Sequence, residues 1–306
     1  MRDRVKDQSM LKPLTVYEAF SPDRVGLDAW RTMLAELWRY RELIQRLVMR
    51  NIAGQFRQSF LRYFWVAIPP VATALIFGML RRSRILNIDV SMGEIPYPLF
   101  VLIGTTYWGF FQQVTIMATT SISNAGSLVS KVYFPREVIV FSSVAGALVN
   151  LAIRLVVLIL AFFVFSYTPH MQILFAPLLF VPLCLLGTGI GLLLAPIDTM
   201  MRDMSQALNF LFQFGLFLVP AVYRTPSLSE AYQTIGSNHI NWKMLVFWAH
   251  NLSPVSHMIR TAVSLIENGT VGSWMALSIA SICSLLVFLI GWRFFHICEP
   301  LLAERL

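Results

Sequence analysis

The stretch that decides the fold runs from Tyr63 to Leu80 and reads YFWVAIPPVATALIFGML, without a single charged residue. A helix needs about 20 predominantly apolar residues to cross a hydrocarbon core roughly 30 Å thick, so this stretch predicts a membrane span. Pro69 and Pro70 predict a kink in that helix, because proline lacks the backbone donor and clashes with the preceding turn.

A long arginine-rich helix is predicted directly before the span, from Asp28 to Arg62. Its apolar residues recur at helical spacing, at Trp30, Leu34, Leu37, Ile44, Leu47 and Val48. Arginines interrupt them, at Arg31, Arg39, Arg46, Arg50 and Arg57. Such an amphipathic helix lies in the plane of a membrane surface, where it offers a handle to a soluble partner.

Composition predicts a membrane protein with five further spans. The chain is 57% hydrophobic and only 13% charged, far from the balance of soluble proteins. The first 60 residues are charged throughout and lack the short apolar core of a signal peptide. Cys184, Cys283 and Cys298 fall in or beside predicted spans, so no disulfide framework is expected. The further spans are predicted at Tyr97–Thr119, Val138–Phe165, Ile173–Ala195, Ser205–Val222 and Ser273–Trp292, and in the fourth span Gly187 and Gly191 allow close helix packing.

The distribution of positive charge predicts the orientation in the membrane. Twelve of the 24 Lys and Arg residues precede the first span, five more are expected on the same side and six on the opposite side. This positive-inside bias places both termini in the cytoplasm. The cluster Arg81–Arg84 runs against the bias, and two interpretations stay open: a solvated or snorkelling end of the span, or a site for an anionic ligand. The net charge of +8 is gathered mainly on one side, which argues against nucleic acid as a partner.

The predicted spans lack acidic residues at membrane depth, and this absence indicates an external energy source. No Asp or Glu lies at membrane depth, whereas transporters driven by ion gradients usually carry carboxylates there. Asp198 and Asp203 fall at a turn after the fourth span and are interpreted as a helix end. The chain has no Gly-Lys dipeptide and hence no phosphate-binding loop of the Walker type. We therefore expect no enzyme activity here, with ATP and Mg²⁺ bound by a separate ATPase.

A polar loop follows the second span, from Thr119 to Glu137, and reads TTSISNAGSLVSKVYFPRE. Ser121, Ser123 and Asn124 are predicted as helix caps, and Pro135 closes the segment before the third span. From composition alone two interpretations stay open: a short helix crosswise to the bundle that docks on a soluble domain, or an ordinary loop whose aromatic residues lie at the headgroups.

Several short motifs resemble one family of membrane proteins. The most specific are FRQSFL at 56–61, followed by Trp65 and Pro69, and SKVYFPR at 130–136. Weaker matches are Arg202-Asp203, Pro220–Tyr223 and Asn251–Pro254. Together these segments, between about Arg39 and Glu299, resemble the permease subunits of ABC exporters for cell-surface polysaccharides such as O-antigen, capsule and teichoic acid.

The resemblance implies an assembly rather than a single chain. Two permease copies pair as a homodimer, two copies of an ABC ATPase dock on them, and a lipid-linked polysaccharide passes between the permeases through the bacterial inner membrane. The permease itself binds no cofactor and is surrounded by membrane lipids. The resemblance also places the ATPase contacts on the surface helix and the loop, at Arg39, Arg46, Arg50, Ser121, Ser123, Asn124, Ser127, Lys131, Tyr133, Phe134, Pro135 and Arg136.

A channel for a glycan favours aromatic rings and few fixed charges, because sugars present apolar C–H faces and must keep sliding. Arg154 is the exception, since an arginine facing lipid in mid-span costs at least about 2.5 kcal/mol. Two interpretations of Arg154 stay open: a contact with the pyrophosphate or hydroxyls of the glycan lipid, and a bond to carbonyls of a neighbouring helix. The aromatic candidates are Trp65, Tyr107, Trp108, Phe110, Phe111, Phe210, Phe214 and Phe217, although aromatic residues also gather at membrane interfaces.

The segment between the last two predicted spans predicts two short helices, Trp242–His250 and Pro254–Ile266, half-inserted at the outer side. By resemblance they form an outer gate, with the candidate residues Trp242, Trp248, Asn251, Pro254 and His257. His239, His250 and His257 have no spacing typical of a metal site, so no metal is expected.

These predictions define an all-α membrane protein of six spans. Residues 1–62 form the cytoplasmic segment with the interface helix, residues 63–298 the transmembrane domain and residues 299–306 a short tail. The predicted function is that of a passive conduit opened by an external ATPase. Three rivals stay open: a type-2 ABC efflux permease for a small drug or lipid, a membrane-embedded glycosyl- or acyltransferase, and a structural scaffold subunit.

Overall fold

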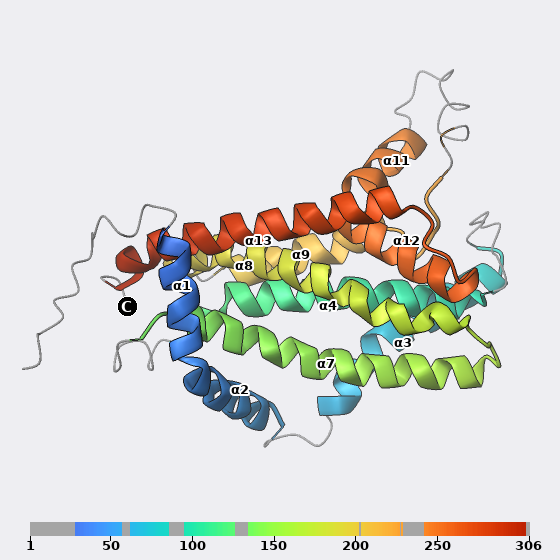
Figure 1. Ribbon diagram of the computed structural model, residues 1–306. Helices are drawn as coiled ribbons and strands as arrows, with labels where there is room; N and C mark the ends of the chain where they lie inside the picture. The colour runs from blue at the N-terminus through green and yellow to red at the C-terminus, as the bar shows by residue number, and fades with distance from the viewer. Residues whose placement is uncertain are drawn as a thin grey trace, which may run out of the picture.

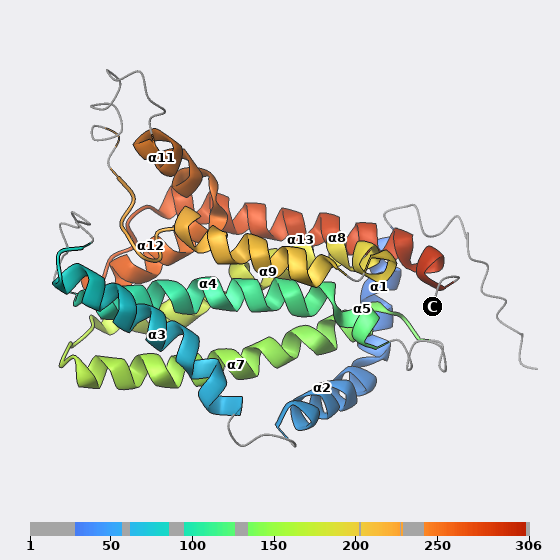
Figure 2. The same ribbon diagram turned by 180° about the vertical axis from the view of Figure 1, so that it is seen from behind.

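The computed structural model describes residues 28–56, 62–85, 95–125, 134–201, 203–226, 228 and 242–303, and within these ranges every regular element is a helix. The long helices run side by side along one axis, and shorter helices lie at both ends of this bundle (Figure 1, Figure 2). The long helices are α3 (Arg62–Arg82), α4 (Tyr97–Thr119), α7 (Glu137–Val164), α8 (Phe180–Met200) and α13 (Trp274–Ala303).

Helix α4 forms the centre of the bundle. It packs against α3, α7, α8 and α12 (Pro254–Glu267), and 17 of its 23 residues are buried. Because protein rather than lipid surrounds it, α4 tolerates Thr105, Thr106 and Thr115, whose hydroxyls donate to carbonyls of the preceding turn. Its bounds match those predicted for the second span.

Glycines bring α8 close to two neighbours. A Cβ on Gly291 of α13 would lie 2.2 Å from the carbonyl oxygen of Gly189, so backbone meets backbone at this crossing. A Cβ on Gly191 would lie 2.2 Å from the Cβ of Ala118 on α4, and Gly187 faces α4 one turn earlier. The predicted packing role of Gly187 and Gly191 is confirmed, and α8 is held tightly between α4 and α13.

Four helical segments of the described chain are long and apolar enough to cross a membrane, judged by length and composition alone. They are Phe64–Arg82, Glu137–Val164, Met171–Met200 and Trp274–Glu299, which correspond to the predicted first, third, fourth and sixth spans. The third of these segments joins the 3₁₀ helix η2 (Met171–Leu179) to α8. The six-span prediction differs at two places: α4 has the length but is less apolar, and the predicted fifth span is shorter.

The predicted fifth span consists of α9 (Met204–Gly215) and the 3₁₀ turn η3 (Leu216–Leu218). Their 12 and 3 residues give about 22 Å of helix, less than the hydrocarbon thickness. The apolar run continues to Val222, but Val219 is extended, the conformation favoured before a proline such as Pro220. The proline therefore ends a helix that composition alone extends to Val222.

The amphipathic segment before the first span is divided in two. The prediction of one helix over Asp28–Arg62 is wrong, because α1 (Asp28–Arg39) and α2 (Arg41–Phe56) meet at a turn, and residues 57–61 lie outside the described ranges. Helix α1 crosses one end of the bundle, where the Trp30 ring lies edge-on to Trp292 of α13 at 5.7 Å (Figure 1). Helix α2 packs against α7. Contacts with two different helices thus bend a segment whose periodicity is continuous.

Two short helices lie at the opposite end of the bundle (Figure 1). Helices α11 (Trp242–Leu252) and α12 are separated by Ser253, as the sequence predicts, and Pro254 begins α12. Nine residues of α12 are buried, and the helix packs against α4, α13 and η2, while its half-insertion into the membrane stays a prediction. We call this end of the bundle the α12 end, and the end with α1 and α2 the α2 end.

Candidate functional site

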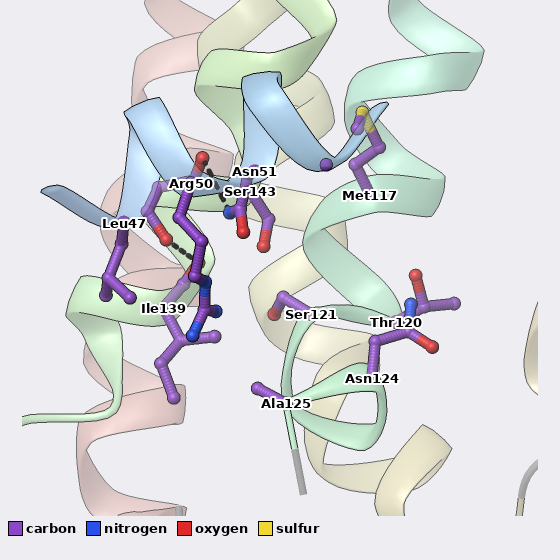
Figure 3. Close-up of a pocket in the computed structure, with 12 residues that line it drawn as sticks. Leu47, Arg50, Asn51, Met117, Thr120, Ser121, Asn124, Ala125, Ile139 and Ser143 are labelled. Carbon is purple, nitrogen blue, oxygen red and sulfur yellow. Dashed lines mark hydrogen bonds between the residues drawn. The ribbon is translucent and has the colours of Figure 1, made fainter. Parts of the chain in front are cut away.

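A polar groove of about 460 Å³ lies at the α2 end, between α2, α7 and the turn that follows α4. Figure 3 shows Arg50 and Asn51 of α2 across the groove from Ser121 and Asn124 of the short helix α5 (Ser121–Asn124). Its apolar wall is supplied by Leu47, Met117 and Ile139.

Hydroxyl groups around the groove donate to the protein's own backbone and leave their oxygens as acceptors. Ser121 donates to the Ala118 carbonyl at 2.7 Å, and Ser142 donates to the Ile139 carbonyl at 2.8 Å. Asn51 Nδ2 donates to the Ser142 carbonyl at 3.5 Å and so links α2 to α7. Because Ser121 and Ser142 are almost fully buried, the groove offers a partner mainly the Arg50 guanidinium and the side-chain oxygens of Ser143 and Asn124.

Within the described residues, none of the predicted caps Ser121, Ser123 and Asn124 is the N-cap residue of α5. The N-cap residue is Thr120, which makes no side-chain capping bond, and the Ser121 and Ser123 hydroxyls lie against carbonyls three residues earlier. The Ser123 hydroxyl also donates to the buried carboxylate of Asp198 near the end of α8. This bond joins the turn after α4 to α8.

The start of α7 is tied to α13 by two polar contacts. The Arg136 backbone N–H donates to Glu299 Oε1 at 3.1 Å, and Arg136 Nη1 donates to the Glu299 carbonyl at 3.3 Å. Beside them Glu137 Oε1 lies 2.9 Å from His296 Nδ1, with 1% and 6% of the two side chains exposed. The chain on either side of residues 126–133 is thus anchored, to α8 before them and to α13 after them.

The groove brings together only some of the predicted ATPase-coupling residues. Those that line it are Arg50, Ser121 and Asn124. Those that lie exposed elsewhere on α1 and α2 are Arg39 and Arg46. Phe134 is buried and Pro135 half-buried just before α7. Outside the described residues lie Ser127, Lys131 and Tyr133.

Two of the predicted channel aromatics are core residues. The rings of Tyr107 and Phe110 lie 4.2 and 5.2 Å from the ring of Phe180 on α8, and the Tyr107 hydroxyl donates to the Ala176 carbonyl. Both side chains are fully buried and present no surface to a solute. The reason is the central position of α4, which surrounds them with other helices.

The remaining channel aromatics form a layered face on α4, α9 and α3. Trp108 and Phe111 are buried beneath Phe212 of α9, with centroid distances of 5.8 and 5.6 Å. Trp65 of α3 and Phe214 of α9 are 63% and 55% exposed. Helices α3 and α9 lie on the same side of the bundle (Figure 2). We call this exposed aromatic surface the α3–α9 face.

Arg154 points into the interface between α7 and α4. Its guanidinium occupies the space beside Gly109, where an added Cβ would lie 1.9 Å from Nη1. Within the described residues Arg154 Nε has no hydrogen-bond partner. The same holds for the buried side-chain oxygens of Asn150, one turn earlier on α7, and Gln113, one turn later on α4. The described helices thus supply no carbonyl to Arg154, and three polar groups lie unpaired in the middle of the bundle.

Two of the predicted gate residues belong to one hydrogen-bond network at the α12 end. His257 Nε2 lies 2.9 Å from the carbonyl of Asn251. Burial lowers the pKa of His257, and it lowers the pKa of His250 further, to about 4, with help from the charge of Arg260. Among the described residues no group of three His, Cys, Asp or Glu side chains lies together as a metal site. The other gate candidates are Pro254, which begins α12, Trp248, which is exposed on α11, and Trp242, whose side chain lies outside the described residues.

Sequence reasoning missed the buried carboxylates Glu137 and Asp198. Each is an isolated acidic residue at the end of an apolar run, and such a residue must find a donor when it is buried. That signal was available in the sequence. The partners, His296 and Ser123, come from distant segments and follow only from the packing of α13 and α5.

Comparisons with known proteins indicate the family to which this chain belongs. Residues 42–267 match the model of the ABC-2 type transporter family. The O-antigen export system permease protein RfbA of Myxococcus xanthus is 24% identical over 202 residues, which cover 65% of this chain and 74% of that protein. The protein of the same name from Klebsiella pneumoniae is 20% identical over 267 residues, 87% of this chain and 95% of that protein.

The family match spans most of the chain and agrees with the all-helical fold and its long apolar helices. The resemblance to an ABC permease, suggested by the short motifs, is thereby confirmed. Membership of a family of membrane transport subunits also explains why the exposed surfaces of α3, α9 and α13 are apolar. This chain therefore belongs to the ABC-2 type transporters, a family of multi-pass membrane proteins.

Proposed function

We propose that this chain is the membrane subunit of an ATP-driven exporter that moves a lipid-linked polysaccharide across the bacterial inner membrane. Two relatives named as O-antigen export permeases support the substrate class, and one of them is matched over 95% of its length. The absence of a Gly-Lys dipeptide in this chain supports a separate ATPase as the source of energy.

The single observation that carries the proposal is the polar groove at the α2 end. Its acceptor oxygens and Arg50 fit a protein segment that donates hydrogen bonds and carries a carboxylate. In this proposal an ATPase of the ABC class inserts such a segment between α2 and α5. The α2 end then faces the cytoplasm together with both termini, and the α12 end faces the outer side.

The anchors on either side of residues 126–133 give the ATPase a route into the bundle. A displacement of α5 is passed to α8 through Ser123 and Asp198. A displacement of the start of α7 is passed to α13 through Glu137 and His296. Because α8 and α13 are in backbone contact at Gly189, the two helices move as one body in this proposal.

The polysaccharide path requires two copies of the chain in this proposal. The centre of one bundle is filled by α4, so the path forms between two α3–α9 faces, where Trp65 and Phe214 offer rings to the sugars. Helices α11 and α12 form the outer gate. Arg154 meets the pyrophosphate of the lipid carrier when α7 and α4 part, because within the described chain it lacks a partner of its own.

Filling the groove tests the docking step. Gly54 lines the groove and a Cβ there meets nothing within 4 Å, so the side chain of Gly54→Trp begins in open space and is expected to fill the groove. Ala53→Trp adds the same ring at the neighbouring exposed residue of α2, which does not line the groove. We expect the Gly54→Trp protein to insert normally, to lose the co-purifying ATPase and to abolish surface polysaccharide, while Ala53→Trp keeps both.

Two outcomes contradict this proposal at different levels. If Gly54→Trp retains the ATPase and full export, the groove is not the docking site. If the wild-type chain purified from its host brings no ATPase with it, the proposed function itself is wrong.

A further inference from the structure

A second pocket, of about 290 Å³, lies at the α12 end between α12 and the segment that follows η3. Arg224, Arg260 and Glu267 are its charged residues, and Phe100 of α4 forms part of its apolar wall. The neighbouring Pro220, Thr225, Val263, Ser264 and Asn268 complete the lining. Two guanidinium groups and one carboxylate thus share one cavity.

Arg224 and Glu267 neutralise each other. Arg224 Nη2 donates to both carboxylate oxygens of Glu267, at 2.8 and 2.6 Å, and only 7% of the Glu267 side chain is exposed. Arg224 Nε is buried and has no hydrogen-bond partner among the described residues. The pair therefore contributes no net charge but leaves one N–H donor unused.

Arg260 keeps its full charge, because its partners are neutral. Its Nη1 donates to Asn251 Oδ1 at 3.2 Å and its Nη2 donates to His257 Nδ1 at 2.7 Å. A nitrogen that accepts from an arginine carries no proton, so His257 is the neutral tautomer with its proton on Nε2, which donates to the Asn251 carbonyl. Burial and the charge of Arg260 also lower the pKa of His257, which keeps the ring neutral at pH 7. Within the described chain no carboxylate pairs with Arg260.

The cavity is thus positive by one charge and large enough for a ligand. A water molecule occupies about 30 Å³ of liquid, so 290 Å³ holds a tetrahedral oxyanion together with several waters. A guanidinium that is half-buried and lacks a counter-ion gains more from an anion than an exposed one does, because the local dielectric is low. Arginine also matches the spacing of phosphate oxygens with two parallel N–H groups.

We propose that the pocket formed by Arg224, Arg260 and Glu267 binds a phosphate group at the α12 end of the bundle. Arg260 supplies the uncompensated charge, and Asn251 and His257 hold its guanidinium in place. Ser264 and Asn268 line the same cavity and add polar side chains beside Arg260. The same chemistry fits free phosphate or the headgroup of an anionic lipid.

The test uses the full chain purified in a neutral detergent and needs neither an ATPase nor export, so it is independent of the proposed function. Wild type, Arg260→Gln and the control Lys243→Gln are titrated with inorganic pyrophosphate while thermal stability is recorded. Lys243 is an exposed cation on α11 that does not line the pocket. A second titration uses nanodiscs of phosphatidylcholine with and without phosphatidylglycerol, which separates free phosphate from lipid headgroups.

We expect wild type and Lys243→Gln to be stabilised by at least one of the two probes. Arg260→Gln should bind that probe at least about tenfold more weakly, the loss expected for one charge-assisted contact. Arg260→Lys, which keeps the charge but not the planar fork, should lie between them and guards against a folding defect in the glutamine variant. Equal binding by Arg260→Gln and wild type, an equal loss in Lys243→Gln, or no response of the wild type to either probe overturns the proposal.

Discussion

The two ends of the bundle hold their charged side chains in different ways, and at the α12 end Arg260 is the pocket residue that has no charged partner within the described chain. At the α2 end the buried groups are the carboxylates Asp198 and Glu137, and their donors come from helices distant in the sequence. At the α12 end the charge is that of Arg260, and its partners Asn251 and His257 lie within nine residues of it. Contacts of the first kind join separate helices, whereas contacts of the second kind orient one side chain.

The difference indicates that the α2 end transmits motion between helices, whereas the α12 end offers a binding site. A bond between α5 and α8 or between α7 and α13 must break before these helices can separate. The network around Arg260 stays intact when α11 and α12 move together, since its members lie on these two helices. Contacts between residues farther apart in the sequence also occur at the α12 end, among them the pair of Arg224 and Glu267 and the hydrogen bond between Thr225 and His250. Variants of these contacts test whether the two ends differ in this way.

The largest effect is expected for Glu137→Ala. Glu137 and His296 are almost fully buried, and losing a buried hydrogen bond to a charged group costs about 2 to 3 kcal/mol. We expect a large loss of thermal stability in detergent and poor recovery of the protein. Glu137→Gln keeps an oxygen that accepts from His296 and should lose much less. An unchanged melting temperature for Glu137→Ala would show that the α2 end does not depend on this contact.

A smaller loss is expected for Ser123→Ala. This variant removes the hydroxyl donor from the buried carboxylate of Asp198, and an unsatisfied buried acceptor costs about 1 to 3 kcal/mol. Ser143→Ala, which removes a hydroxyl that lines the groove, is the matched control. Because the bond joins α5 to α8, Ser123→Ala should also weaken the coupling of ATP hydrolysis to export. Equal stability and equal coupling in the two variants would show that the Ser123 hydroxyl does not anchor α5 to α8.

Arg224→Gln should cost about 1 kcal/mol, less than either change at the α2 end. A third of the Arg224 side chain is exposed, so solvent screens part of the interaction with Glu267. Thermal unfolding at low and high salt measures the contribution of this ion pair. The difference in melting temperature between wild type and Arg224→Gln should shrink as the salt concentration rises. A loss larger than that of Glu137→Ala would reverse the comparison between the two ends.

An effect that is absent at pH 7 and appears only on acidification is a pH dependence at the α12 end. The pKa of the buried His250 is lowered to about 4, so the unfolded chain takes up a proton near pH 6.5 while the folded chain does not. The stability from this residue is complete above pH 6.5 and is lost as the pH falls toward 4. The difference in melting temperature between wild type and His250→Gln, measured at pH 7 and pH 5, should therefore shift against the wild type at pH 5. A difference that does not change with pH contradicts this assignment.

Much of the helical organisation was predictable from local patterns. The bounds of α4 match the prediction, and the two helices between the last predicted spans are both present. Proline explains both a success and a failure. Pro254 begins α12 as expected, whereas Pro220 ends the helix that follows α9 earlier than the apolar run suggests. The break at Tyr40 has no such local signal, since it follows from contacts with two different helices.

The candidate sites were less predictable, because burial depends on neighbours. Tyr107 and Trp108 are adjacent aromatics in the sequence, yet one packs against α8 and the other beneath α9. Their helix is uniformly apolar around its circumference, so its periodicity does not distinguish the two sides. The groove at Arg50 combines α2, α5 and α7, and no single segment of the sequence contains it.

The sequence by itself determined that this protein lies in a membrane as a set of helices, because an apolar run can satisfy its backbone there only as a helix or a closed barrel. The short motifs determined its family. Only the tertiary structure decided which apolar helix lies at the centre, which carboxylate meets which donor and which arginines have no carboxylate partner within the described residues. Those outcomes depend on distances between segments far apart in the chain, and such distances are set by packing rather than by composition.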